Sequence, residues 1–290
     1  MKVLITGSKG QVGYCLVERL AHIADVLALD HQGLDITNQQ EVVKTIAEFQ
    51  PDYIINAAAY TAVDRAELEI KHAYEVNSKG PEFLAKAAQQ VDAVMLHIST
   101  DYVFDGESNT CYKESDPVRP QGVYGRSKLS GEDAVIESCN KYLILRTAWV
   151  FGEHGNNFVK TMLRLAQTRD ELRIVDDQFG GPTYAGDIAN ALITMIEFIE
   201  QGNQPEWGIY HFSGMPYASW YDFAIKIFEL AEREGILEIQ PNITPIPTSA
   251  YPTTAKRPAN SRLDCSKINN QFDIGPSDWM IALNNIQAYK

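Results

Sequence analysis

The stretch VLITGSKGQVG, residues 3–13, decides the fold of this chain. Three aliphatic residues and a threonine, typical of a buried strand, lead into a G-x-x-G-x-x-G turn made by Gly7, Gly10 and Gly13, and the next residues have helical spacing. Positions without side chains let backbone N–H groups approach a pyrophosphate, and the helix N-terminus offers partial positive charge to that anion. The pattern predicts a dinucleotide-binding turn, although a purely structural strand-to-helix turn also favours glycine.

Outward from this turn, short apolar runs alternate with helical stretches through the first half of the chain. The predicted strands contain residues 3–5, 26–29, 53–55, 94–96 and 142–145, and the predicted helices span residues 11–21, 38–49, 70–90 and 124–137. Thr37 is expected to cap the second of these helices. Such alternation predicts a doubly wound α/β sheet of parallel strands, which binds ligands at the carboxyl ends of its strands.

The second half of the chain is less regular and predicts a smaller domain. Helices are expected at residues 157–168, 185–201, 220–234 and 277–285, and the five prolines from Pro241 to Pro258 predict an ordered, irregular loop. The composition changes after Trp149. We therefore expect a dinucleotide-binding domain over residues 1–148 and a mainly substrate-binding domain over residues 149–290, with residues 183–201 returning to the first.

Composition argues against several classes of protein. The 290 residues include 25 lysines and arginines against 38 aspartates and glutamates, a net charge of −13, whereas nucleic-acid binding needs a basic surface. No apolar run approaches the roughly 18 residues of a membrane span, and no signal-peptide pattern follows Met1. The four cysteines and six histidines show no metal-ligand spacing. We expect a cytoplasmic protein with no nucleic-acid partner, no membrane partner and no metal site.

Asp30 follows the second predicted strand, about 20 residues after the glycine turn. An acid at this place normally accepts a hydrogen bond from the ribose 2′-hydroxyl and repels a 2′-phosphate, which by itself favours NADH over NADPH. Asp35 and Ile36 are candidates to flank the adenine, with a turn at the start of a helix as the alternative. The small residues within Asn56–Thr61 permit close approach of a ribose or nicotinamide, although small residues also simply pack.

Tyr124 and Lys128 are four residues apart and therefore lie on one face of the helix that follows the fourth strand. A nearby cation favours tyrosinate and lowers a phenol pKa from about 10, which suits a proton donor to a carbonyl that is being reduced. The spacing is common, but Tyr124 is the only one of 14 tyrosines with a lysine at this distance. Thr100 and Asp101 end the fourth strand, where their side chains either share a substrate oxygen with Tyr124 or form a capping turn.

These motifs resemble the extended short-chain dehydrogenase/reductases, and more narrowly the dTDP-4-dehydrorhamnose reductase family. The resemblance covers nearly the whole chain and is carried by the glycine turn and by residues 56–64, 99–104, 124–128, 146–152, 155–162, 177–183 and 247–263. It implies a Rossmann-type doubly wound parallel sheet with a smaller α/β substrate-binding domain. The implied reaction is reduction of the C4 ketone of dTDP-4-dehydro-β-L-rhamnose to dTDP-L-rhamnose, with NADPH or NADH as cofactor.

The resemblance also implies roles for single residues. Tyr124 would donate the proton, Lys128 would lower its pKa and hold the nicotinamide ribose, and Thr100 would take the usual serine position beside the carbonyl. Arg257 would bind the substrate diphosphate, since its fork geometry suits phosphate; a surface arginine is the alternative. Positions matching sugar contacts are Thr100, Asp101 and Trp149, of which the tryptophan is equally compatible with a core residue. Positions matching cofactor contacts are Gly7, Gly10, Gln11, Val12, Gly13, Asp30, Asp35, Ile36, Ala57, Ala59, Tyr60, Thr61, Tyr124 and Lys128.

Family members use NADH, NADPH or both, which weakens the argument from Asp30. Some members dimerise through a metal held by glutamates, one of them in the first helix, where this chain has Tyr14 and Cys15. We therefore expect a monomer or a homodimer that is not metal-linked. Two other hypotheses stay open. One is a nucleotide-sugar epimerase or dehydratase of the same superfamily, and the other is a non-catalytic regulatory subunit, against which the retained Tyr124 and Lys128 argue.

Overall fold

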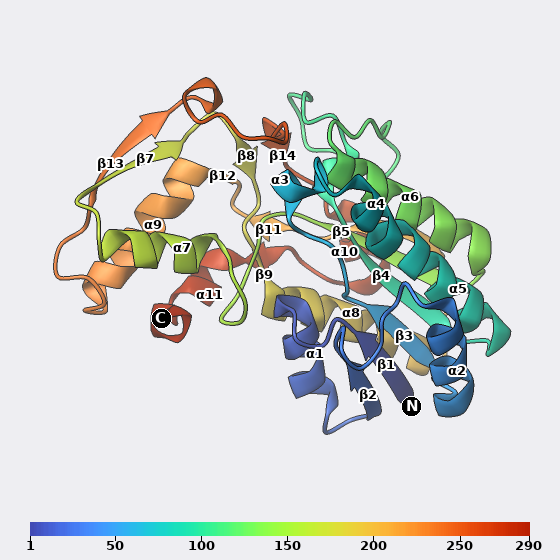
Figure 1. Ribbon diagram of the computed structural model, residues 1–290. Coiled ribbons are helices and arrows are strands. Elements are labelled where there is room, and N and C mark those ends of the chain that lie inside the picture. Colours follow the sequence, from blue (N-terminus) through green and yellow to red (C-terminus); the bar gives the residue numbers. More distant parts are fainter.

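The computed structural model describes residues 1–290, which form a large α/β body with a smaller body beside it (Figure 1). The large body is built on a six-stranded sheet in which every neighbouring pair of strands is parallel. Its strands, in order across the sheet, are β2 (Asp25–Leu29), β1 (Lys2–Thr6), β3 (Tyr53–Asn56), β4 (Val94–Thr100), β5 (Tyr142–Thr147) and β10 (Gly208–His211). The predicted Rossmann-type fold class is confirmed. The strand order reverses between β1 and β3, where such sheets bind ligands.

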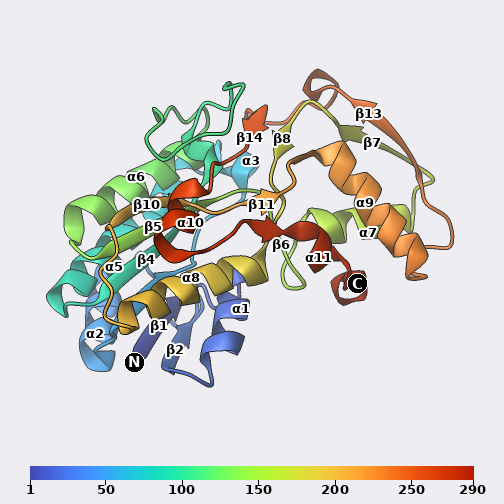
Figure 2. The ribbon, with the colours of Figure 1, turned by 180° about the vertical axis from the view of Figure 1, so that it is seen from behind.

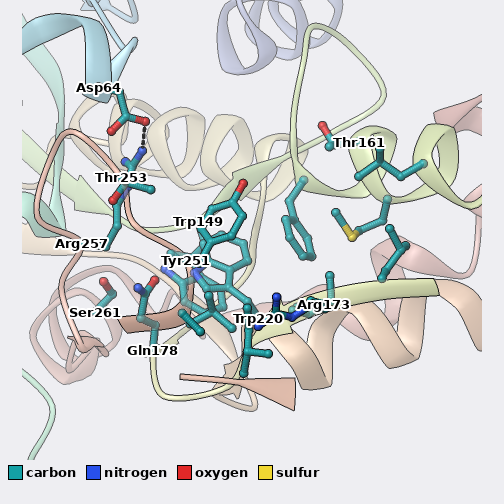
Figure 3. Close-up of a pocket in the computed structure, with 18 of the residues that line it drawn as sticks. Asp64, Trp149, Thr161, Arg173, Gln178, Trp220, Tyr251, Thr253, Arg257 and Ser261 are labelled. Carbon is teal, nitrogen blue, oxygen red and sulfur yellow. Dashed lines mark hydrogen bonds and ion pairs between the residues drawn. The ribbon is translucent and has the colours of Figure 1, made fainter. Parts of the chain in front are cut away.

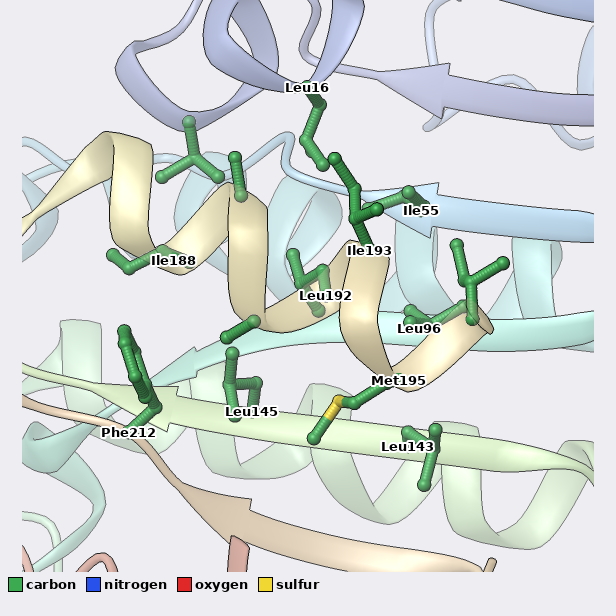
Figure 4. Close-up of a cluster of buried hydrophobic side chains, with 14 of the residues drawn as sticks. Leu16, Ile55, Leu96, Leu143, Leu145, Ile188, Leu192, Ile193, Met195 and Phe212 are labelled. Atoms are coloured by element: carbon green, nitrogen blue, oxygen red, sulfur yellow. The ribbon is translucent and has the colours of Figure 1, made fainter. Parts of the chain in front are cut away.

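Helices cover both faces of this sheet, because successive strand residues point to opposite sides and both sides are apolar. One face is packed by α1 (Gln11–Leu20), α8 (Ala185–Glu200) and α10 (Ser266–Phe272). Figure 4 shows α8 laying Leu192 and Met195 over Leu145 and its neighbours on the strands. The other face is packed by α2 (Gln39–Phe49), α5 (Gly80–Gln90) and α6 (Val123–Ser138). The two layers hold the strand ends rigidly at one edge.

Parts of the second half of the chain return to this sheet, as the view from behind shows (Figure 2). Helix α8, which lies within residues 183–201, packs in the same core as the strands of the sheet. Strand β10 and helix α10 also return, which the sequence pattern did not indicate. Strand β10 has only four residues, and its pairing with β5 is a contact between distant segments that local periodicity does not report.

The smaller body has its own apolar core, formed by α7 (Phe158–Ala166), α9 (Trp220–Arg233), α11 (Trp279–Leu283) and β7 (Glu171–Val175). Short strand pairs complete it: β6 (Val150–Phe151) with β9 (Thr183–Tyr184), β11 (Gly214–Met215) with β15 (Ser277–Asp278), and β8 (Phe179–Gly180) between β12 (Ala218–Ser219) and β14 (Asn260–Ser261). The prediction of an irregular loop after Pro241 is wrong for β13 (Asn242–Ile246), which pairs with β7. Pro245 is tolerated there because a two-stranded sheet consists of edge strands.

Two further expectations about helices differ from the structure. Asn38, and not Thr37, caps α2, because its side-chain oxygen accepts from the backbone N–H groups of Gln40 and Glu41. The helix expected over residues 70–90 is α4 (Ile70–Tyr74) and α5, joined by a π-helical turn over Glu75–Lys79. A short helix, α3 (Val63–Ala66), precedes them. No helix is both long and apolar enough to cross a membrane.

Candidate active site

The glycine turn lies between β1 and α1, at the strand-order reversal. Gly7 has a φ of +73°, and a Cβ there would lie 2.6 Å from the backbone nitrogen of Ala58 in the next loop. A Cβ at Gly13 would overlap the carbonyl oxygen of Gly7. These two positions therefore accept only glycine, and the first turn of α1 approaches the loop backbone closely enough to present N–H groups to a pyrophosphate. The turn fits a dinucleotide.

Asp30 follows β2 and contacts Lys9 of the glycine turn. Its carboxylate accepts from the backbone N–H groups of Gln32 at 3.1 Å and Gly33 at 3.0 Å, and it forms an ion pair with Lys9. The hydrogen bond from Lys9, with help from these N–H groups, holds the pKa of Asp30 below its usual value. Lys9 also offsets the negative charge that would repel a ribose 2′-phosphate, so this site does not require NADH.

The other candidate cofactor contacts differ in what their side chains do. Asp35 accepts from the backbone N–H and the hydroxyl of Thr37, at 2.9 and 2.8 Å, and Ile36 is buried in the core, so both fit the alternative of a turn at the start of a helix. The side chain of Asn77 fixes the backbone of Tyr60. Its Oδ1 accepts from the Tyr60 N–H at 2.8 Å, and its Nδ2 donates to the Tyr60 carbonyl at 3.0 Å. Asn77, from the π-helical turn, was missed by sequence analysis.

Asn77 also fastens this loop to the helix that carries Tyr124. Its Nδ2 donates to Ser127 Oγ at 3.0 Å. Gln11, at the start of α1, instead accepts from Asn157 of the smaller body at 3.0 Å. The loop after β3 is thus fastened to α6, and the start of α1 is fastened to the smaller body.

Tyr124 lies on the first turn of α6, and Lys128 follows one turn later, as predicted. Burial raises the pKa of Tyr124 above the usual value of a phenol, and the neighbouring Thr100 hydroxyl opposes this rise. The expected lowering of the phenol pKa by Lys128 is therefore not observed. The Lys128 ammonium instead donates to the backbone carbonyl of Ile98 at 2.7 Å, and it lies 3.5 Å from the ring of His97. Burial lowers the pKa of Lys128 to about 8.

Asp101 completes this cluster. The Thr100 hydroxyl donates to its Oδ1 at 3.1 Å, whereas its Oδ2 is buried without a hydrogen-bond partner. Burial raises the pKa of Asp101 to about 6, because the interior penalises the charged carboxylate. An unpartnered, buried carboxylate oxygen beside a phenol and a threonine is suited to bind a hydroxyl of a ligand.

A cavity of about 650 Å³ is lined by residues of both bodies (Figure 3). Tyr102 is one of them, and its ring packs edge-on against that of Tyr124. Trp149 also lines the cavity and stacks on Trp220, with ring centroids 3.5 Å apart and planes 10° apart. Trp149 is therefore a wall of the cavity and not a core residue. Its indole sits over Gly180, where a Cβ would lie 2.5 Å from the ring.

Arg257 also lines the cavity, where it pairs with Asp64 and donates to the Tyr102 hydroxyl at 3.2 Å (Figure 3). It is thus not a free surface arginine. The sequence analysis missed further residues of the wall, namely Trp220, Tyr251, Arg169 and Arg173. Only Trp220 carried a local signal, because the capping box of Ser219 and Asp222 sets the start of α9 at this residue.

Comparison with known proteins identifies the family of the chain. The family model described as RmlD substrate binding domain matches residues 1–289. The chain belongs to this family. The dTDP-4-dehydrorhamnose reductase of Aggregatibacter actinomycetemcomitans is 54% identical over 290 residues, which are 99% of each chain. The RmlD family match therefore runs through both bodies, the glycine turn and the cavity wall.

Solved structures with the same name resemble this chain throughout its length. The crystal structure of a dTDP-4-dehydrorhamnose reductase from Clostridium acetobutylicum has a TM-score of 0.90 and 42% identity, and covers 98% of each chain. The enzyme from Bacillus anthracis, in complex with NADP, has a TM-score of 0.90 and 38% identity, and covers 100% of this chain and 99% of its own. The agreement extends the RmlD family assignment from sequence to structure.

The first helix carries Tyr14 on its exposed side and Cys15 on its buried side. The ring of Tyr14 packs on that of His154, with centroids 3.6 Å apart and planes tilted by 32°. No group of three or more histidine, cysteine, aspartate or glutamate side chains is arranged to hold a metal ion.

Proposed function

We propose that the chain is a dTDP-4-dehydrorhamnose reductase, which reduces the C4 ketone of dTDP-4-dehydro-β-L-rhamnose with NADPH or NADH, Tyr124 donating the proton. The observation that carries this proposal is the packing of Tyr124 against Tyr102, a residue of the arginine-containing cavity, beside a sheet whose first strand leads into the glycine turn. Full-length similarity to an enzyme of this name at 54% identity supports the substrate. We further propose a cytoplasmic enzyme that acts as a monomer or as a homodimer without a metal link.

The residues of the glycine turn and the loops beside it are proposed to hold the cofactor. Backbone N–H groups of Gly7–Gly13 would bind the pyrophosphate. At the adenine ribose, Asp30 would accept a hydrogen bond from a 2′-hydroxyl, and Lys9 would bind a 2′-phosphate. Lys128 would hold the nicotinamide ribose. When bound, the reduced nicotinamide supplies the hydride.

Tyr124 is proposed to hold and then release the proton. Because burial raises its pKa, the phenol is protonated at neutral pH and available to the substrate oxygen. As negative charge develops on that oxygen, the phenol proton moves to it. The Thr100 hydroxyl would donate a hydrogen bond to the same substrate oxygen. Lys128, one helical turn away, does not shift the pKa of Tyr124, so its proposed role is to hold the nicotinamide ribose.

The cavity is proposed to take the nucleotide sugar. The stacked Trp149 and Trp220 offer an aromatic face, and three arginines, Arg169, Arg173 and Arg257, offer positive charge for the diphosphate. Arg257 would exchange its partner Asp64 for a phosphate oxygen. The unpartnered Oδ2 of Asp101 would accept from a sugar hydroxyl.

The proposal is tested by loss of reduced-nicotinamide absorbance when the purified protein is given dTDP-4-dehydro-β-L-rhamnose generated in situ. We expect Tyr124→Phe to lower kcat by roughly 10²–10⁴-fold while NADPH binding is retained. Tyr142→Phe, at the start of β5 and outside the cavity, is the matched control and should keep wild-type activity. Normal turnover of Tyr124→Phe would remove this role. Stoichiometric NAD retained through purification, without net oxidation of NADPH, would favour an epimerase or dehydratase instead.

A further inference from the structure

A line of four buried polar side chains runs from the glycine turn to Lys128, and its first three members have no part in the reaction as described above. Its members are Thr6 at the end of β1, Asn56 at the end of β3, His97 in β4 and Lys128 in α6. Thr6 Oγ1 donates to Asn56 Oδ1 at 2.7 Å, and Asn56 Nδ2 lies 3.0 Å from His97 Nδ1. His97 Nε2 then lies 3.5 Å from Lys128 Nζ.

The orientation of the Asn56 amide is fixed by a backbone group. Its Oδ1 lies 3.1 Å from the backbone nitrogen of Ala58, which can only donate, so this atom must be the amide oxygen. The amide nitrogen of Asn56 must therefore face His97 and donate to it. Because His97 Nδ1 accepts this bond, the imidazole is neutral and carries its single proton on Nε2.

The proton on Nε2 points toward Lys128. An ammonium group has three donors and no acceptor, so the N–H of His97 cannot bond to a protonated Lys128, whereas a neutral amine offers a lone pair. The contact at 3.5 Å therefore favours the neutral amine over the ammonium. The carbonyl of Ile98, which accepts from Nζ at 2.7 Å, serves either form.

The remaining charges near Lys128 do not cancel this effect. Glu132, one turn further along α6, raises the pKa of Lys128, but both of its oxygens are bonded by Arg146 from β5, at 2.9 and 2.6 Å. Ser99 of β4 also donates to Glu132 at 2.5 Å. Tyr124 is one turn earlier on α6. Burial lowers the pKa of His97 well below its usual value, so His97 adds no charge of its own.

We propose that His97 is a positioning residue: held in one tautomer by Asn56, it presents an N–H donor to Lys128 and so limits the pH range over which Lys128 stays protonated. In the reductase proposed above, on which the catalytic consequence rests, loss of this proton sets the alkaline limit of activity. Asn56→Asp reverses the tautomer. A carboxylate still accepts from Thr6 and Ala58, but it requires a proton on Nδ1 of His97 and leaves a lone pair on Nε2 toward Lys128.

The first test concerns the wild-type protein and is independent of activity. Nitrogen-15 NMR of histidine-labelled protein, with His97 assigned through the His97→Gln variant, reports which ring nitrogen is protonated. We expect His97 to stay neutral, with its proton on Nε2, from about pH 5.5 to 9. A proton on Nδ1, or a titration close to the usual histidine value, would overturn the proposal.

The second test is the titration of Lys128, followed by carbon-13 NMR of ε-labelled lysine in the wild-type protein, in Asn56→Asp, in His97→Gln and in the double variant. The negative charge of the aspartate raises the pKa of Lys128 with or without His97. The tautomer change affects Lys128 only where His97 is present, so the comparison separates the two effects. We expect Asn56→Asp to raise the proton affinity of Lys128 about tenfold more when His97 is present than when it is replaced by glutamine. The alkaline limit of kcat should rise in parallel. Equal shifts in both backgrounds would overturn the proposal. Absence of turnover in the wild type would remove the proposed function but leave both NMR tests intact.

Discussion

Breaking the buried ion pair between Arg146 and Glu132 by changing one partner is predicted to destabilise the protein strongly. Arg146 Nε and Nη2 donate to the two carboxylate oxygens, at 2.9 and 2.6 Å, and the side chains are only 2% and 1% exposed. Removing one partner of such a pair leaves an uncompensated buried charge, which costs about 3–5 kcal/mol. We therefore expect Glu132→Gln to lower the free energy of unfolding by about 3 kcal/mol or more.

The matched control is an exposed pair in the turns that precede β4 and β5. Lys141 Nζ lies 2.7 Å from Asp92 Oδ1, but the side chains are 42% and 78% exposed, and such a pair is worth about 0.2–1 kcal/mol. Urea unfolding followed by far-UV circular dichroism gives both free energies from the midpoint and the slope. If Glu132→Gln costs no more than Lys141→Met, the claim that breaking the buried Arg146 pair is strongly destabilising is refuted. The double variant Glu132→Gln with Arg146→Met should cost much less than the sum of the two single changes.

Three further predictions concern the cofactor, the substrate and pH. Gly13→Ala is expected to weaken NADPH binding roughly tenfold or more in a fluorescence titration, because its Cβ would overlap the Gly7 carbonyl oxygen, whereas Gly275→Ala, whose Cβ meets nothing within 4 Å, should bind normally. Trp149→Ala is expected to raise KM for the nucleotide sugar roughly tenfold with unchanged NADPH affinity; an equal loss of both would place Trp149 outside the sugar site. Burial raises the pKa of Asp101 from 3.8 to about 6, so between these pH values the folded state binds more protons and stability falls as pH rises, in total by about 3 kcal/mol. Asp101→Asn should remove that fall in urea unfolding at pH 4 and pH 7, and an unchanged pH dependence would contradict the buried carboxylate.

The parts of the fold that were predictable from sequence have local signals. The strands β1 to β5 are apolar runs bounded by turn residues such as the glycine turn, and the structure confirms them. Strands β10 and β13 were missed because each is defined by pairing with a distant segment, and Pro245 argued against a strand. Periodicity carries no information on such pairings.

The candidate site also contains some residues with local sequence signals and others that only the completed fold brings together. Tyr124, Thr100 and Lys128 could be placed near one another because helical spacing and strand ends are local features. The raised pKa of Tyr124 could not be predicted, because it is caused by burial under the completed fold. Trp220 stacks on Trp149, and His97 lies against Lys128. Each of these pairs joins residues that are far apart in the sequence, so local patterns could not indicate them.

Transfer of deuterium from the cofactor to the sugar tests the central claim most directly. The purified protein is given dTDP-4-dehydro-β-L-rhamnose and NADPH deuterated at the transferring position, and the products are examined by NMR. A reductase that uses Tyr124 as proton donor predicts one oxidised cofactor per dTDP-L-rhamnose, deuterium at C4 of the sugar, and a product yield that collapses in Tyr124→Phe. A sugar product without deuterium, with the cofactor still reduced, would contradict the account.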